Sequence, residues 1–144
     1  MNKGVTVSQV HDEICTEEHY VASLDLLGAK EIILKDKEDI SLIQVRNIYN
    51  SWVRINKDGY FLKLKIKVFS DNIVVAIKSE YEDAVDNLLE FVSYMAEHFL
   101  ECGYKPRGGV CKGKLFLDDV FVWGEGLVKA YQLESKKAIY PRII

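Results

Sequence analysis

Apolar and polar positions follow two different rhythms along this chain. Short apolar runs rich in β-branched residues, each bounded by turn residues, predict β-strands. Longer stretches in which apolar residues recur every three or four positions predict amphipathic helices, and the clearest, about 81–102, is ended by Gly103. The expected strands lie near 18–26, 60–69, 72–78, 106–116, 119–123 and 138–144, and the expected helices follow Gly28 and lie near 41–55, 81–102 and 127–135.

The order of these elements limits the fold. A strand is followed by two helices, a hairpin, a helix, a second hairpin, a helix and a last strand. One antiparallel-rich sheet with the helices packed on one face satisfies this order, so we expect an α+β fold of the ferredoxin-like kind. We expect residues 1–17 to form a polar lead-in and residues 18–144 to form the domain. The apolar end at Ile144 suggests that a C-terminal segment is missing.

Composition narrows the class of protein. A chain of 144 residues with 28% charged and 49% hydrophobic residues fits one globular domain. A net charge of −3 gives no basic surface, which argues against nucleic-acid binding. No apolar run approaches the roughly 20 residues of a membrane span, and the N-terminus lacks the pattern of a signal peptide. The three scattered cysteines favour neither disulfides nor zinc, so a cytoplasmic protein is expected.

Two carboxylates stand at the ends of predicted strands. Asp25 closes the apolar run that begins at Tyr20, and Asp71 lies in a Ser-Asp-Asn corner between two apolar runs. On one small sheet, these side chains and a backbone carbonyl such as that of Leu26 suit Mg²⁺ or Mn²⁺, hard cations that also bind substrate phosphates. The alternative is structural, with Asp25 capping the next helix and Asp71 serving as a turn residue.

Other residues also allow a functional and a structural interpretation. The backbone amides of Gly28, Ala29 and Lys30, where a helix begins, suit phosphate groups, although most such turns bind nothing. Lys67 stands between apolar neighbours and either reaches a polar pocket or extends to solvent. The glycine pair after Arg107 marks a bulge or a close approach of two backbones.

Four short segments occur in a familiar order. They are Val-Ala-Ser-Leu-Asp-Leu-Leu-Gly-Ala-Lys at 21–30, Lys-Val-Phe-Ser-Asp at 67–71, Arg-Gly-Gly-Val-Cys-Lys-Gly at 107–113 and Gly-Glu-Gly-Leu-Val-Lys-Ala-Tyr-Gln-Leu-Glu at 124–134. They resemble the two metal motifs, the glycine-bearing strand and the dimer-interface helix of class III nucleotidyl cyclases. Five details are similar to the pyrimidine cyclases of bacterial Pycsar anti-phage systems: Asp-Leu-Leu-Gly, Phe-Ser-Asp-Asn, Arg-Gly-Gly, Ala-Tyr-Gln-Leu-Glu-Ser and Ala-Ile-Tyr-Pro-Arg-Ile-Ile.

This resemblance implies an activity and an assembly. In the family, the ribose 3′-hydroxyl of a nucleoside triphosphate attacks the α-phosphorus and pyrophosphate leaves, with two metal ions at each site. The sites lie at the interface of a head-to-tail homodimer. The residues implied are Asp25, Asp71 and the Leu26 carbonyl for two Mg²⁺ or Mn²⁺ ions, Gly28, Ala29 and Lys30 for the phosphates, and Lys67 and Phe121, from the partner subunit, for the base.

The sequence also departs from the wider family. Phe121 stands where the family has an aspartate that reads adenine, which argues against ATP and for a smaller, pyrimidine base. The family's transition-state asparagine and arginine fall on Val128 and Gln132. Because losing a cation near the transferring phosphorus costs much of the rate, either Arg107 or Arg142 substitutes or turnover is slow.

Three hypotheses follow for the function. The first is a pyrimidine nucleotide cyclase that makes cyclic UMP or cyclic CMP as a second messenger in anti-phage defence, with the choice between UTP and CTP left open. The alternative, which Val128 and Gln132 favour, is a non-catalytic cyclase-like module that binds nucleotide or dimerises. A protein-interaction domain without nucleotide requires both Asp25 and Asp71 to be structural.

Overall fold

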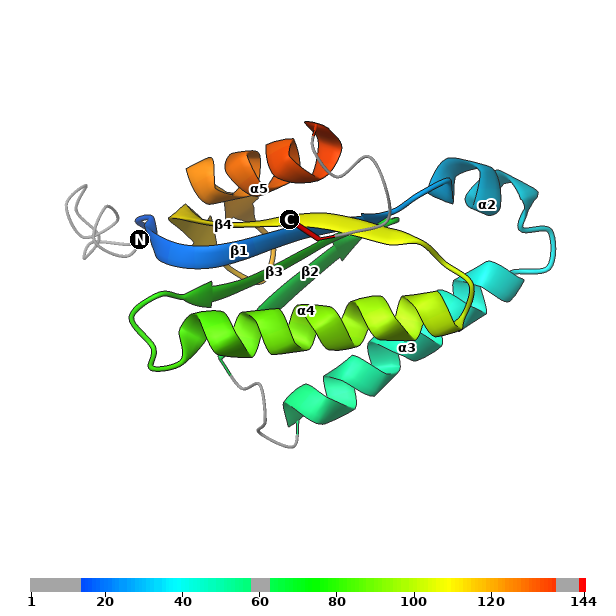
Figure 1. The fold of residues 1–144 in the computed structure, drawn as a ribbon, viewed down its shortest axis with the longest axis horizontal. Coiled ribbons are helices and arrows are strands. Elements are labelled where there is room, and N and C mark those ends of the chain that lie inside the picture. Colours follow the sequence, from blue (N-terminus) through cyan, green and yellow to red (C-terminus); the bar gives the residue numbers. More distant parts are fainter. Residues whose placement is uncertain (1–13, 58–62, 137–142) are drawn as a thin grey trace, which may run out of the picture.

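A five-stranded antiparallel sheet lies between helices on both of its faces (Figure 1). The computed structural model describes residues 14–57, 63–136 and 143–144. Among these residues the sheet order is β2-β3-β1-β4-β5, so the predicted α+β class and antiparallel sheet are confirmed. The elements are β1 (Glu17–Leu26), α2 (Ala29–Lys35), α3 (Ile40–Lys57), β2 (Lys65–Phe69), β3 (Asn72–Lys78), α4 (Ala84–Glu101), β4 (Pro106–Leu117), β5 (Val122–Trp123) and α5 (Glu125–Lys136).

The central strand β1 sets the register of the sheet. Leu24 of β1 lies opposite Ile73 of β3 on one side and opposite Gly108 of β4 on the other. The next residue, Asp25, lies opposite Arg107 of β4. Every residue of β1 from Val21 to Leu24 is buried, as expected for a strand segment that is covered on both faces.

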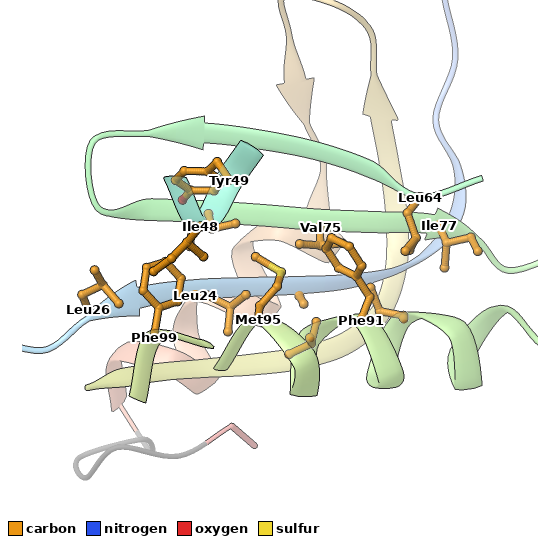
Figure 2. Close-up of a cluster of buried hydrophobic side chains, with 14 of the residues drawn as sticks. Leu24, Leu26, Ile48, Tyr49, Leu64, Val75, Ile77, Phe91, Met95 and Phe99 are labelled. Carbon is orange, nitrogen blue, oxygen red and sulfur yellow. The ribbon is translucent and has the colours of Figure 1, made fainter. Parts of the chain in front are cut away.

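One face of the sheet carries the main hydrophobic core, under α3 and α4. The apolar positions of α4 that recur at three and four are buried: Ala84, Leu88, Phe91, Val92, Met95 and Phe99. Figure 2 shows Phe91, Met95 and Phe99 pointing from α4 toward β1 and β3. Phe99 also meets Tyr49 of α3 and Tyr104 edge to face, with ring centroids 6.4 and 6.1 Å apart. The burial of these large side chains is the main source of stability.

The opposite face of the sheet is covered by α5 (Figure 1), whereas the sequence predicted all helices on one face. Here the backbones approach closely: a Cβ added at Gly109 would lie 2.6 Å from the Ala130 carbonyl oxygen, and one at Gly113 would lie 2.8 Å from Gly126 Cα. The buried apolar cluster is correspondingly small, comprising Val21, Ala76, Leu115 and Ala130. Because β1 and β3 are apolar on both sides, the second face also needs a cover, and α5 supplies it.

Two element boundaries differ from the prediction for local reasons. α4 begins at Ala84 instead of Tyr81, because the chain before it turns and Asp83 has a φ of 57°. β5 is only two residues long. The chain just before β5 turns at Asp118, whose Oδ1 accepts a hydrogen bond from the backbone N–H of Phe121 at 2.7 Å.

Parts of the predicted elements lie outside the described residues, namely 60–62 of the first hairpin, 138–142 of the last strand and 1–13 of the lead-in, whose boundary at 17/18 stays a prediction. Beyond that gap, Ile144 pairs with β4: its N–H donates to the Gly108 carbonyl at 2.8 Å, and its carbonyl accepts the N–H of Val110. Within the described chain, no helix is both long and apolar enough to cross a membrane.

Candidate functional site

The two predicted carboxylates emerge at the same end of the sheet. Asp25 is one residue past Leu24 on β1, and Asp71 is two residues before Ile73 on β3, the cross-strand partner of Leu24. Because β1 and β3 are antiparallel, the end of one strand meets the start of the other at a single edge. The topology therefore places both aspartates at the same edge of the sheet.

Asp25 is held by an arginine. The Arg107 guanidinium donates Nε–H to Oδ1 at 2.8 Å and Nη2–H to Oδ2 at 3.2 Å, a two-point ion pair across β1 and β4. The Asp25 side chain is 14% exposed and that of Arg107 is 23% exposed, so the pair stands at the edge of the interior. Planar two-point pairs of this type are stronger than single hydrogen bonds. Asp25 does not cap α2, whose N-cap is Gly28, so the capping alternative is not what the structure shows.

A second carboxylate lies behind the same arginine. Glu134 of α5 is 1% exposed, and its Oε1 is 3.4 Å from Arg107 Nε. Neither carboxylate oxygen has a hydrogen-bond partner among the described residues. Burial, followed by the adjacent Asp25, raises the pKa of Glu134 from its ordinary 4.5 to about 7, although Arg107 and the nearby Ser23 oppose the shift. The face under α5 therefore contains two carboxylates and one cation.

Asp71 occupies the two-residue turn between β2 and β3. The preceding residue, Ser70, has a φ of 55°, a conformation that hairpin turns require and that non-glycine residues adopt at a cost. Both residues line a cavity of about 320 Å³ between this turn and helices α2 and α3. Burial and the Asp71 charge raise the pKa of Tyr49 on α3, which indicates that Asp71 lies toward the α3 face.

The structure therefore brings the two aspartates to one edge but directs them differently. Asp25 pairs with Arg107 beneath α5, whereas Asp71 lines the cavity beside α3, and Asp25 is not among the described residues of that cavity. No group of three or more His, Cys, Asp or Glu side chains in the described part of the chain has the geometry of a metal site. The donors at this edge are nevertheless of the type that a hard cation binds, because they are two carboxylates and the backbone carbonyl of Leu26.

The predicted phosphate-binding turn follows Asp25 directly. Gly28 has a φ of 72° and precedes α2, which begins with the buried Ala29 and the exposed Lys30. No atom lies within 4 Å of a Cβ added at Gly28, so backbone conformation, and not space, favours glycine there. The first turn of a helix leaves backbone N–H groups without intrahelical partners, which is the feature that suits an anion.

The predicted base-contacting residues are separated within the chain. Lys67 is half-buried on β2 opposite Val74 of β3, and faces away from the main core because its neighbour Ile66 packs against that core. Phe121 is 48% exposed at the other end of the sheet, where its ring stacks on Trp123 at 5.9 Å.

The two positions that depart from the family pattern lie together on α5. Val128 is 55% exposed and Gln132 is also exposed, one helical turn away. The structure therefore directs both side chains outward from the sheet that α5 covers.

Neither the burial of Glu134 nor the direction of the Arg107 side chain was predicted from the sequence. A signal for Glu134 was present, because Gly126, Ala130 and Glu134 recur every four residues and form the buried stripe of α5. Because Glu134 lies on the same helix face as Gly126 and Ala130, its side chain is expected on the buried side of α5. Nothing in the sequence indicated which acid Arg107 would meet. Arg142 lies outside the described residues.

Comparison with known proteins identifies the architecture. No protein-family model matches the sequence, and no curated protein matches it. Among solved structures, the guanylate cyclase domain of RhGC from Catenaria anguillulae, solved in complex with GTP, superposes with a TM-score of 0.66 at 15% identity, covering 83% of this chain and 73% of that one. The adenylyl cyclase CyaB from P. aeruginosa gives 0.60 at 16% identity, with 89% and 76% covered. The chain has the fold of class III nucleotidyl cyclase domains.

A third structure of the same cyclase fold extends the comparison. The monomeric guanylyl cyclase domain of the RhoGC fusion protein from Blastocladiella emersonii has a TM-score of 0.65 at 13% identity, with 84% of this chain and 76% of that chain covered. At such identities the similarity establishes the cyclase fold and leaves the chemistry to the residues of this chain.

Proposed function

We propose that this protein is a pyrimidine nucleotide cyclase, which converts UTP or CTP to the 3′,5′-cyclic monophosphate and pyrophosphate, and that its product is a messenger in anti-phage defence. The observation that carries the proposal is the position of Asp25 and Asp71 at one edge of a sheet with the class III cyclase fold. The pyrimidine preference and the defence role rest on the sequence resemblance and on Phe121, which supplies a ring where the wider family has a carboxylate.

The residues of this edge have distinct tasks in the proposed reaction. Asp25, Asp71 and the Leu26 carbonyl would hold two Mg²⁺ or Mn²⁺ ions. The backbone N–H groups of Gly28, Ala29 and Lys30 would bind the phosphates. When bound, such ions lower the pKa of the attacking hydroxyl and stabilise the leaving pyrophosphate. Arg107 already occupies one lone pair on each Asp25 oxygen, so it would compete with a cation for this carboxylate.

Separation of the predicted site residues favours a homodimer. Phe121 shares an open hollow with Ile14 and Thr16, just before the start of β1, whereas Asp25 stands near the end of that strand. Asp25 lies nine positions after Thr16, which corresponds to about 30 Å of extended chain. One chain does not place Phe121 near Asp25, so a second copy, arranged head to tail, would supply it.

The second candidate function is a non-catalytic nucleotide-binding or dimerisation module. Exposed Val128 and Gln132 favour it, because they replace the two side chains that the family uses on the transition state. The arginine that occupies Asp25 also favours it.

The test is turnover with the purified chain, Mn²⁺ and each of ATP, GTP, CTP and UTP, with cyclic product identified by mass spectrometry. We expect cyclic UMP or cyclic CMP to exceed cyclic AMP and cyclic GMP. Asp71→Asn should abolish the product and leave the fold intact, because a two-ion site needs both carboxylates. Asp86→Asn, which alters an exposed aspartate in the first turn of α4, is the matched control and should leave turnover unchanged.

Different results would contradict different parts of the proposal. Equal rates with ATP and UTP would contradict the role given to Phe121. An Asp71→Asn variant that unfolds would support the structural interpretation of the turn. Absence of any cyclic product from a folded dimer would favour the non-catalytic module.

A further inference from the structure

We propose that Arg107 is a positioning residue that moves between two carboxylates, leaving Asp25 for Glu134 when a divalent cation binds Asp25. Glu134 is thus the second partner that makes Asp25 available to the metal. This inference rests on the proposed role of Asp25 as a metal ligand and adds a control step to it.

The geometry places Arg107 between the two acids. Its Nε is 2.8 Å from Asp25 Oδ1 and 3.4 Å from Glu134 Oε1, so one nitrogen faces both carboxylates. The hydrogen bonds of Arg107 go to Asp25, whereas Glu134 has an ion-pair distance without a hydrogen bond among the described residues. A small rotation of one flexible side chain therefore exchanges the stronger partner for the weaker one.

Burial explains why Glu134 would accept the guanidinium. Glu134 is 1% exposed, and a buried carboxylate without a well-oriented partner is costly. If a cation neutralises Asp25, Arg107 loses its main partner and Glu134 remains unsatisfied beside it. Pairing these two residues satisfies both, so the metal gains a free ligand without leaving Arg107 unpaired.

The position of Glu134 is fixed by the backbone. Gly109, two residues after Arg107 on β4, brings α5 so close that an added Cβ would lie 2.9 Å from the Glu134 backbone nitrogen. The helix that carries Glu134 is therefore held against the strand that carries Arg107. In contrast, the Arg107 side chain is long and 23% exposed, so it is the member of the trio that can move.

If Arg107 and the cation compete for Asp25, substitutions of Arg107 and of Glu134 should change the Mn²⁺ affinity in opposite directions. Replacing Arg107 with Met removes the competitor, so the free protein should bind Mn²⁺ more tightly. Replacing Glu134 with Gln removes the alternative partner, so Arg107 stays on Asp25 and Mn²⁺ should bind more weakly. Because Glu134 acts through Arg107, Glu134→Gln should have no further effect once Arg107 is Met.

The experiment is a calorimetric titration of the full chain with Mn²⁺ alone, without nucleotide, with Asp25→Asn to identify the heat that belongs to this site. We expect Arg107→Met to tighten binding at least fivefold and Glu134→Gln to weaken it at least fivefold, the lower end of ordinary coupling between sites. The double variant should match Arg107→Met within about twofold, the usual error of additivity.

Matched controls come from a second ion pair between the same strands. Lys112 of β4 lies 3.5 Å from Glu18 of β1, on the exposed part of the sheet. Lys112→Met and Glu18→Gln make the same chemical changes away from Asp25 and should leave Mn²⁺ affinity unchanged. Thermal unfolding of every variant checks the fold, and Arg107→Gln replaces Arg107→Met if the latter does not fold.

Several results would overturn the proposal. If Glu134→Gln weakens binding equally with and without Arg107, Glu134 acts on the cation directly. If Arg107 variants bind Mn²⁺ no more tightly than the wild type, or if no binding depends on Asp25, there is no competition. None of these results depends on turnover, so an active cyclase can fail this test, and a chain that passes it can still be inactive.

Discussion

The two faces of the central sheet are packed with different kinds of side chain. The face under α3 and α4 is filled by large apolar side chains such as Phe91, Met95 and Phe99, all about 1% exposed or less. The face under α5 has glycine and alanine at its closest contacts, and it carries the Asp25–Arg107–Glu134 trio. One face removes large apolar surfaces from water, and the other holds three charged side chains, of which Glu134 is fully buried and Asp25 and Arg107 stand at the edge of the interior.

This difference shows how a small domain can hold charges beneath a helix. Desolvating charged groups costs free energy that their mutual attraction recovers only in part. The large core on the opposite face supplies the stability that offsets this cost. We therefore expect substitutions on the α3/α4 face to change stability most, and substitutions on the α5 face to affect α5 and the trio first.

The largest effect is expected from Phe91→Ala in the main core. Phe91 is fully buried, and removing a buried phenyl ring leaves a cavity that the surrounding side chains fill only in part. The free energy of unfolding should fall by about 3–5 kcal/mol, as measured by denaturant titration. Leu89→Ala, on the exposed side of the same helix, is the control and should cost much less. Equal losses from both variants would contradict the assignment of the core to this face.

Gly109→Ala should have the next largest effect, and a more local one. The new methyl group would lie 2.5 Å from Leu133 Cβ and 2.6 Å from the Ala130 carbonyl oxygen, so α5 must move away from β4. Overpacking of this kind costs about 1–3 kcal/mol. Relative to the wild type, amide hydrogen exchange should become faster in α5, with a smaller change in α4. Equal protection of both helices would show that α5 tolerates the methyl group.

The sequence predicted the large-residue face better than the small-residue face. Apolar residues at spacings of three and four in α4 indicate a buried stripe, because large side chains in that pattern have few other positions. In α5, Gly126 and Ala130 contribute little to such a pattern, so the helix was expected but not the face that it covers. The glycine pair after Arg107 allowed a close approach of two backbones to be predicted as one alternative, but not that α5 would be the element that approaches.

The candidate site was predicted in the same uneven way. Asp25 and Asp71 could be placed at one edge because each ends or begins a recognisable strand. Their side-chain directions could not be predicted, since these depend on Arg107 and Glu134, which lie far from them in sequence. Pairings between distant charges are set by strand register and helix docking, neither of which is local.

The charge under α5 should make stability depend on pH. Since the pKa of Glu134 is raised from 4.5 to about 7, the folded protein keeps a proton that the unfolded chain loses within this interval. Stability should therefore fall as pH rises from about 4.5 to 7, because over this interval the folded state binds more protons than the unfolded chain. Glu134→Gln, which mimics the protonated form, should lose this dependence. A variant with the wild-type pH profile would assign the dependence to another group.

The smallest effect on stability is expected from Ser70→Gly, in the turn between β2 and β3. Ser70 adopts a φ of 55° in the turn before Asp71, a conformation that costs a non-glycine residue about 1–2 kcal/mol. Glycine removes this strain but makes the unfolded chain more flexible, at a cost of about 0.4–1 kcal/mol. Ser70→Gly should therefore stabilise the protein by about 0.5–1 kcal/mol, the difference between these two terms. Ser79→Gly is the matched control: Ser79 lies in the turn after β3 without a left-handed φ, so glycine there should only destabilise. If both variants lower the thermal midpoint, the turn at Ser70 is not strained, and the position of Asp71 does not depend on that strain.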